Sequence, residues 1–254
     1  LARTSTFQLY SGVKVYGGFP EGGGGFGDRD PALYATQLTG RLNNGLFAYH
    51  VVTARDTDAT ARLDGLTIQR GRADAAGDDI GGGVLSERSD LTLHNVHLWD
   101  NEAEVGGGMA ILEGAPTLTD VGFTGNAATD AGGLYVEEGN PRLDHVTFTR
   151  NEADYGGAMA TIRDASPAMS NIAFRSNSAT HRGGAAYLAG GSPQIINALF
   201  IGNQAETGGA LYSYMANPLA IVNTTFAANE ATTKGGGITL DKAKAAVNNA
   251  IFWD

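Results

Sequence analysis

Carboxylates that recur at intervals of about 25 residues are the first residues in this sequence whose type and spacing could do chemistry. Glu102 and Glu104 are followed by Asp130 and then by Glu152 and Asp154. If successive repeats lie side by side at the strand spacing of about 4.8 Å, such carboxylates are close enough to share a Ca²⁺ ion, which takes six to eight oxygen ligands. These five residues are therefore the predicted Ca²⁺ ligands, and no other cofactor is predicted.

The same carboxylates support a catalytic hypothesis. Two carboxyl groups about 5 to 9.5 Å apart can act as acid and base, or as acid and nucleophile, in glycoside hydrolysis. A polysaccharide lyase or glycoside hydrolase is the enzyme class that this pattern would serve. The simpler interpretation is a solvated acidic turn on an acidic protein.

Tyrosines recur at equivalent positions after a repeated Gly pair, and we predict that they point outward. Tyrosine rings on a flat strand face can stack on sugar rings while their hydroxyl groups bond polar partners. Ordinary β-propensity is the alternative explanation. With their acidic neighbours they form the predicted ligand-binding set: Tyr135, Tyr155, Tyr187, Tyr212, Tyr214, Glu104, Asp130 and Asp154.

Two further groups contain histidine. Asp120 and His145 take adjacent places in one column of the repeat, and an Asp–His pair can serve as a base and its orienting group. Replacement of asparagines by side chains that also hydrogen-bond is the preferred interpretation. His94 and His97 share one segment, but metal binding would need further ligands.

These side chains are positioned by a repeat with two signals in step. Phe-x-x-Asn units and their variant begin at residues spaced 25, 25, 26, 26, 26 and 26 apart, at Leu98, Phe123, Phe148, Phe174, Phe200, Phe226 and Phe252. A Gly pair keeps the same period, at residues 82–83, 107–108, 132–133, 156–157, 183–184, 208–209 and 236–237. Two motifs that hold one period from Gly82 to Gly237 indicate a solenoid.

Each unit alternates apolar and polar residues in short runs separated by turns, as in Leu134-Tyr135-Val136-Glu137. The sequence therefore predicts an all-β, single-stranded parallel β-helix of about 25–27 residues per coil that winds at least seven times. We expect one domain over residues 1–254, with irregular first coils in 1–80 and regular repeats in 81–254, as a fragment of a longer chain. Residues 22–31 are expected to form a flexible excursion whose glycines and charges do not pack.

Two columns of asparagine are predicted to stabilise the stack. In a stacked column each Asn side chain can hydrogen-bond its neighbours, and Asn tolerates the left-handed conformation that a tight bend requires. The first column is the Asn of the Phe-x-x-Asn motif. The second is Asn95, Asp120, His145, Asn171, Asn197, Asn223 and Asn249.

The Phe-x-x-Asn and Gly-Gly-Ala-type motifs over residues 80–254 resemble the repeats of the chlamydial polymorphic outer membrane proteins; Gly208-Gly209-Ala210-Leu211 fits that pattern. The opening residues 11–19, SGVKVYGGF, resemble the start of many right-handed β-helix proteins from environmental bacteria. Together with general β-strand chirality, the resemblance implies a right-handed coil. It also implies surface exposure, adhesion or carbohydrate contact.

Composition excludes some functions. A formal net charge of −10 disfavours nucleic-acid partners, because phosphate neutralisation needs clustered Lys and Arg. There is no cysteine, so disulfides and thiolate metal sites are ruled out. No apolar run of 18 residues is present, so no transmembrane helix is predicted.

The leading hypothesis is an extracellular or bacterial cell-surface module for adhesion or carbohydrate binding, without catalysis. The motif sets of polygalacturonase-like and pectate-lyase-like β-helices are absent. The enzyme hypothesis above is the alternative, and a structural element of a surface assembly is the second. Self-association is predicted through outward apolar residues near the C-terminus: Ile196, Leu199, Ile201, Val222, Ile251 and Trp253.

Overall fold

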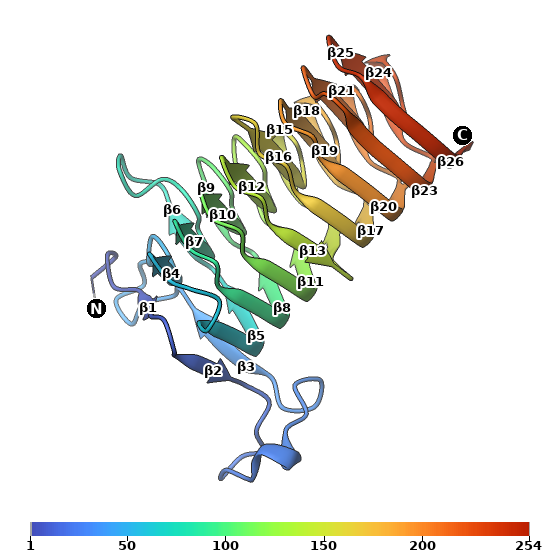
Figure 1. The fold of residues 1–254 in the computed structure, drawn as a ribbon. Coiled ribbons are helices and arrows are strands. Elements are labelled where there is room, and N and C mark those ends of the chain that lie inside the picture. The colour runs from blue at the N-terminus through green and yellow to red at the C-terminus, as the bar shows by residue number, and fades with distance from the viewer. Residues whose placement is uncertain (1, 254) are drawn as a thin grey trace.

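The computed structural model describes residues 2–253 and shows an all-β solenoid of about eight turns with about 26 residues per coil. This confirms the predicted parallel β-helix. The strands stack along one axis, so the two termini lie at opposite ends of the solenoid (Figure 1). Within the described residues, no helix is long and apolar enough to span a membrane.

The first side of the solenoid is a nine-stranded parallel sheet built from short strands. Each strand follows a Gly-rich corner in the regular coils, and its inward residues face the core. In spatial order the strands are β1 (Phe7–Leu9), β4 (Val52–Arg55), β7 (Val84–Glu87), β10 (Met109–Leu112), β12 (Leu134–Glu137), β16 (Met159–Ile162), β19 (Ala186–Ala189), β22 (Leu211–Tyr214) and β25 (Ile238–Asp241).

The second side is an eleven-stranded parallel sheet that contains the Phe of each repeat. Most of its strands have eight or nine residues, are longer than those of the first side and are bent in the middle. In spatial order the strands of this sheet are β2 (Lys14–Tyr16), β5 (Arg62–Gln69), β8 (Thr92–Trp99), β11 (Thr117–Thr124), β13 (Arg142–Asp144), β17 (Ala168–Arg175), β20 (Gln194–Ile201), β23 (Leu219–Ala227) and β26 (Ala245–Trp253), with β3 (Thr36–Thr39) beside β5 and β14 (Thr147–Thr149) between β11 and β17.

The third side closes each coil after the repeated Asn and is less regular. In the earlier coils it consists of isolated bridges and one short pair, whereas in the later coils it forms a four-stranded sheet. The strands are β6 (Arg72–Ala73), β9 (Glu102–Ala103), β15 (Glu152–Tyr155), β18 (Ser178–Arg182), β21 (Gln204–Thr207) and β24 (Glu230–Lys234).

The core is a column of stacked phenylalanines surrounded by aliphatic residues from the first two sides. Ring centroids from Phe123 through Phe252 are 4.6 to 4.9 Å apart and the ring planes are nearly parallel. Phe123, Phe148, Phe174, Phe200 and Phe226 are fully or almost fully buried. This spacing is the strand spacing of a parallel sheet, so one aromatic residue per coil forms a continuous stack.

The repeated asparagines form the predicted hydrogen-bonded column beside the phenylalanines. Asn151, which is fully buried, accepts bonds from the backbone N and Nδ2 of Asn126, and its own Nδ2 donates to the Phe123 carbonyl and to Asn177 Oδ1. The same pattern continues through Asn203. Each buried amide is therefore satisfied by the coils on both sides.

The expected left-handed backbone of these buried asparagines is wrong. The positive φ falls on the preceding residue, such as Arg150 at 53° and Ser176 at 53°. It is the second asparagine column that has the left-handed conformation, from Asn95 at 50° to Asn249 at 51°. This column marks the bend in the middle of each long strand.

The Gly pairs permit close backbone packing at the corner between the third and first sides. A Cβ atom on Gly132 would lie 2.5 Å from the Glu152 carbonyl oxygen, a distance that side chains do not tolerate. The residue before several pairs also has positive φ, such as Gly106 at 66°. The glycines are needed because the coils approach each other closely there.

Residues 17–35, the excursion loop, leave the first coil between β2 and β3 and project from the solenoid (Figure 1). The loop contains a short 3-10 helix, η1 (Phe26–Asp28). The expectation that its charges do not pack is wrong. Arg29 lies over the rings of Tyr16 and Phe26, at 5.0 and 5.2 Å from their centroids, and its guanidinium group reaches Asp64 on the next coil.

Candidate functional site

A polar site lies where the excursion loop meets the outer face of the eleven-stranded sheet. A pocket of about 290 Å³ opens there, with Pro31 and Ala35 of the excursion loop and Thr36 of β3 as one wall. Its floor is the bend of three successive strands, β5, β8 and β11. Polar side chains in the pocket are Thr67, Asn95, His97 and Asp120, together with Thr36.

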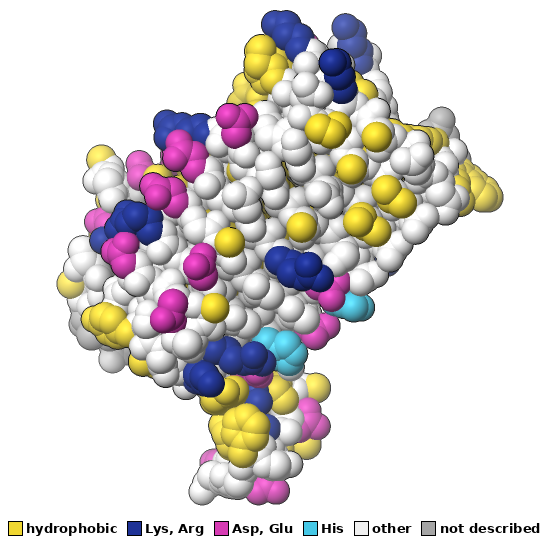
Figure 2. Space-filling model, viewed as in Figure 1, with side chains coloured by type: hydrophobic (Ala, Val, Ile, Leu, Met, Phe, Trp, Pro, Cys, Tyr) yellow, Lys and Arg dark blue, Asp and Glu magenta, His cyan; other side chains and the backbone are white. Residues whose placement is uncertain are grey.

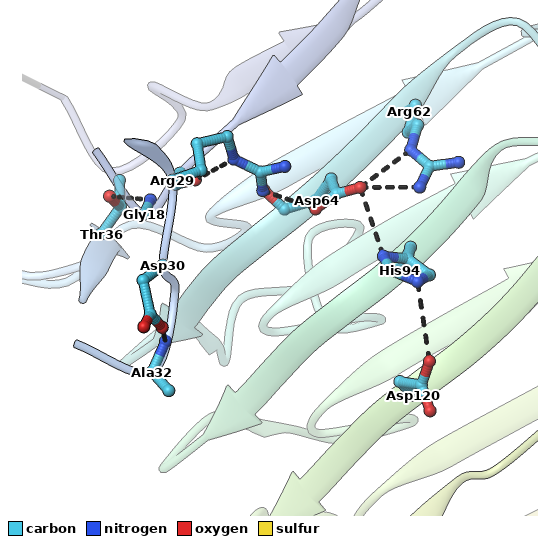
Figure 3. A network of polar contacts seen from close by, with 10 residues as sticks. Gly18, Arg29, Asp30, Ala32, Thr36, Arg62, Asp64, His94 and Asp120 are labelled. Atoms are coloured by element: carbon cyan, nitrogen blue, oxygen red, sulfur yellow. Dashed lines mark hydrogen bonds and ion pairs between the residues drawn. The ribbon is translucent and has the colours of Figure 1, made fainter. Parts of the chain in front are cut away.

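Asp64 on β5 is the buried centre of a polar network beside this pocket (Figure 3). Arg29 Nη2 lies 2.6 Å from Asp64 Oδ1, and Arg62 Nη2 lies 2.6 Å from Asp64 Oδ2. Burial raises the pKa of the Asp64 carboxyl, but hydrogen bonds and positive charge from the two arginines outweigh it and hold the pKa below its ordinary value. Asp64 is therefore anionic at neutral pH and fixes the excursion loop.

His94 on β8 connects this buried carboxylate to the surface. Its Nδ1 lies 3.2 Å from Asp64 Oδ2, and its Nε2 lies 3.6 Å from Asp120 Oδ2 on β11 (Figure 3). About half of the Asp120 side chain is exposed, and the residue lines the pocket. The arrangement is an imidazole between two carboxylates, one buried and fixed and the other open to solvent.

His97 lines the same pocket and lies three residues after His94 on β8. Its Nε2 lies 3.0 Å from Thr124 Oγ1, and burial lowers the pKa of its imidazole. The site therefore offers a neutral imidazole, an amide from Asn95 and a carboxylate from Asp120. These groups can donate and accept hydrogen bonds to hydroxyl-bearing ligands.

The second asparagine column extends this site along the solenoid as an exposed row, which we call the outer ladder: Asn95, Asp120, His145, Asn171, Asn197, Asn223 and Asn249. Asn223 Nδ2 donates to Asn197 Oδ1 at 3.1 Å, and Asn249 Nδ2 donates to Asn223 Oδ1 at 2.7 Å. Each amide group retains a second N–H and a second lone pair. Those unused groups lie on the outer surface, once per coil.

The tyrosines predicted to form an exposed column are largely covered. Tyr135 and Tyr212 are only 7% and 3% exposed, and their hydroxyl groups bond Glu137 and Asp241. Burial raises the pKa of Tyr212 to about 12. Both side chains point away from the main core as predicted, but Tyr135 packs in a second apolar cluster with Leu85, Ala110, Ala131 and Ala160, and Tyr212 packs against Tyr187 and Arg182. These two rings are not available to stack on a ligand.

The other predicted tyrosines are half-buried. Tyr187 stacks on Tyr212 at 5.6 Å, and Tyr155 meets Tyr187 edge-on at 5.9 Å. Tyr155 also lies 5.3 Å from the ring of the exposed His181. Tyr214 is near Lys242, whose ammonium lies 5.7 Å from its ring centroid. Among the predicted tyrosines, Tyr155 lies beside the predicted carboxylates, because it pairs with Asp130 on the third side of the solenoid.

The predicted carboxylate column divides into separate positions. Glu102 and Glu152 occupy one register position with Ala127 between them, whereas Asp130 pairs with Val105 and Tyr155. Burial and the nearby Glu104 and Asp154 carboxylates raise the pKa of Asp130. Among residues 2–253, no three Asp, Glu or His side chains are grouped as a metal site. The five predicted ligands do not surround one point, and Ca²⁺ binding stays a prediction.

Among the residues of the Figure 3 network, the sequence analysis did not propose Arg29, Arg62 and Asp64, which form the ion pairs at its centre. A usable signal was present, because Leu63-Asp64-Gly65-Leu66 aligns with Leu93-His94-Asn95-Val96 and so places Asp64 beside His94. The predicted catalytic pair, Asp120 and His145, is not the pair in contact, because Asp120 lies beside His94. His145 instead lies beside Asp144, with Nδ1 and Oδ2 3.2 Å apart.

The apolar residues predicted to face outward near the C-terminus do so. Ile196, Ile251 and Trp253 are exposed, and Leu199 and Val222 are half-buried. In Figure 2 the region of β20 and β23 is yellow and white, whereas magenta, blue and cyan side chains gather nearer the N-terminal end and along the edges.

No protein-family model, curated protein or solved structure matches this chain, so fold and site geometry carry the functional conclusion.

Proposed function

We propose that this chain is a non-catalytic, extracellular or bacterial cell-surface module that binds polysaccharide along the outer face of its eleven-stranded sheet. The outer ladder carries the proposal. It presents one side chain with unused hydrogen-bonding groups per coil, at the 4.6 to 4.9 Å period measured on the phenylalanine stack. That period is close to the advance of a linear polysaccharide per sugar, so one sugar can meet one coil.

A role in adhesion fits the same surface. The resemblance of the repeats to those of the chlamydial polymorphic outer membrane proteins supports a cell-surface location and contact with host glycans. The outer ladder ends at the pocket beneath the excursion loop, where Pro31 and Thr36 lie beside the bends of β5, β8 and β11. A structural role in a surface assembly is the competing proposal, and it predicts self-association in place of glycan retention.

Replacement of both Asn197 and Asn223 by glycine tests whether the outer ladder binds polysaccharide. Glycine accepts the positive φ of 55° and 52° at these positions while it removes both amide groups. We expect the double variant to lose about 10-fold in polysaccharide affinity, which corresponds to about 1.4 kcal/mol, or roughly one to two neutral hydrogen bonds. Retention on immobilised polysaccharides and affinity electrophoresis measure this loss.

The matched control is Ala228→Gly, which removes a side chain at another positive-φ position, 49°, away from the ladder. It should leave affinity unchanged. Thermal unfolding of all variants shows whether folding is retained. Equal polysaccharide affinity in the double variant and the wild type would mean that the ladder is only structural.

A second candidate function, acid–base catalysis on a polysaccharide, is favoured by the contacts of His94. Asp64 and Asp120 flank its two ring nitrogens at 3.2 and 3.6 Å, so both carboxylates favour the protonated imidazole electrostatically. Asp120, which lines the pocket, and His94 beside it are then two adjacent proton-transfer groups.

The Asp120→Asn variant separates catalysis from binding. Asparagine fits at this position, because Asn95 and Asn171 occupy it in other coils with the same left-handed backbone. If the pocket is catalytic, we expect product release to fall by roughly 10² to 10⁴-fold while retention changes little. Release of oligosaccharides by the wild type is the prerequisite, and its absence on polysaccharides that are retained would exclude the second candidate.

A further inference from the structure

We infer that the ligand of this surface is an uncharged linear glycan, held mainly on the outward side chains of β20, β23 and β26, which we call the uncharged patch. The inference rests on the proposed function and adds the chemical class of the ligand. It also moves the main contact away from the pocket, toward the part of the outer ladder that contains only asparagines.

The distribution of charge supports this class. None of the residues of β20, β23 and β26 is Asp, Glu, Lys, Arg or His, although the chain as a whole has a net charge of −10. The earlier strands of the same sheet carry charged residues: Arg62, Asp64, Asp120, Arg142, Asp144 and Arg175. A carboxylate or ammonium group on a ligand would lose water over the uncharged patch without gaining a partner of opposite charge.

The arrangement of polar and apolar rows also fits a neutral sugar chain. Asn197 and Asn223 form a central amide row, Ile196 and Val222 lie in register on one side of it, and Leu199 and Thr225 lie in register on the other. A sugar ring offers hydroxyl groups at its edge and C–H groups on its faces. Amides can bond the hydroxyl groups while the aliphatic rows pack on the C–H groups.

A second copy of this chain is a less suitable occupant. Burial of the patch in a protein interface would enclose the unused N–H and carbonyl groups of the amide row, which need partners once water is removed. A glycan supplies hydroxyl partners at the same period as the row. Association of two copies is retained as an outcome of the test.

The test uses soluble oligosaccharides that share one β-1,4-linked backbone and differ in a single substituent: hydroxyl, acetamido, amine or carboxylate. Isothermal titration with the purified chain is expected to show binding of the two neutral forms. The amine and carboxylate forms should bind at least about 10-fold more weakly. Because no charged pair is formed, affinity for the neutral forms should stay constant between about 50 and 300 mM salt.

The matched variants are Val222→Lys, which places a charge in the patch, and Gln204→Lys, which places the same charge on the exposed third side. We expect a loss of about 10-fold or more in neutral-glycan affinity for the first and no change for the second. Tighter binding of a charged form by the wild type would overturn the inference and leave the proposed function standing. Absence of binding to all four forms and to immobilised polysaccharides would reject both.

Light scattering on the same samples completes the test. A wild-type dimer that Val222→Lys converts to a monomer, together with no glycan binding, would assign the patch to contact between copies and overturn the inference. A monomer that binds neutral glycan supports it.

Discussion

Replacement of Phe174 by alanine is expected to lower the free energy of unfolding by about 3–5 kcal/mol. Phe174 is fully buried, and its ring stacks between Phe148 and Phe200 at centroid distances of 4.9 and 4.6 Å. Alanine leaves a cavity that rigid strands on both sides cannot close, because each coil is hydrogen-bonded to the next. Neighbouring coils also lose the ring faces on which their own phenylalanines pack.

Chemical denaturation followed by circular dichroism measures this loss. Phe174→Leu is the control, since it keeps most of the apolar volume and should cost less than about 1.5 kcal/mol. A loss below about 1 kcal/mol for the alanine variant would contradict the prediction and mean that the stacked rings contribute little to stability. Because a repeat protein is stabilised by contacts between neighbouring units, the transition of the alanine variant can also broaden or split.

The repeat could be predicted from sequence because stacking forces equivalent residues into columns. One fully buried Phe and one fully buried Asn per coil leave a strict period, and the structure places them as the sequence predicts. The outer ladder could be predicted for the same reason, since each bend needs a residue that tolerates positive φ. A single sequence therefore reveals those columns of residues that have the same structural role in every coil.

The burial of Tyr135 and Tyr212 could not be predicted from alternation. Strand period two shows that these rings point away from the main core, but it does not show what lies on the other side. Tyr135 is covered by the second apolar cluster, which includes Ala131 from the corner of its coil, and Tyr212 is covered by Tyr187 and Arg182. An outward-facing side chain in a small solenoid is therefore not always an exposed one.

The pocket could not be predicted because it depends on irregular segments. Arg29 is separated by 35 residues from Asp64 and belongs to an insertion in the first coil, so no period connects them. The contact between His94 and Asp64 requires the register across a coil of 30 residues, which is longer than the regular coils that follow it. Irregular coils carry the most distinctive chemistry of the chain, and sequence periodicity gives the least information there.

Replacement of Asn151 by leucine is expected to destabilise the protein by about 4 kcal/mol or more. Leucine has nearly the same shape but removes two accepted hydrogen bonds, from the backbone N and Nδ2 of Asn126, and two donated bonds, to the Phe123 carbonyl and Asn177 Oδ1. Asn151 is fully buried, so water cannot replace these bonds. Each buried polar group left without its partner costs about 1–3 kcal/mol, and the apolar gain from leucine offsets only part of the total.

Chemical denaturation gives the size of this effect, and the outer ladder supplies the comparison. Asn223→Gly removes an amide with inter-coil bonds of 3.1 and 2.7 Å, but Asn223 is exposed and water can bond the groups left behind. We expect it to cost less than about 1 kcal/mol. Similar losses for the two variants would mean that burial does not decide the value of these bonds. A large loss for Asn151→Leu alone would show that the inner asparagine column holds the coils together, which leaves the outer column free to bind a ligand.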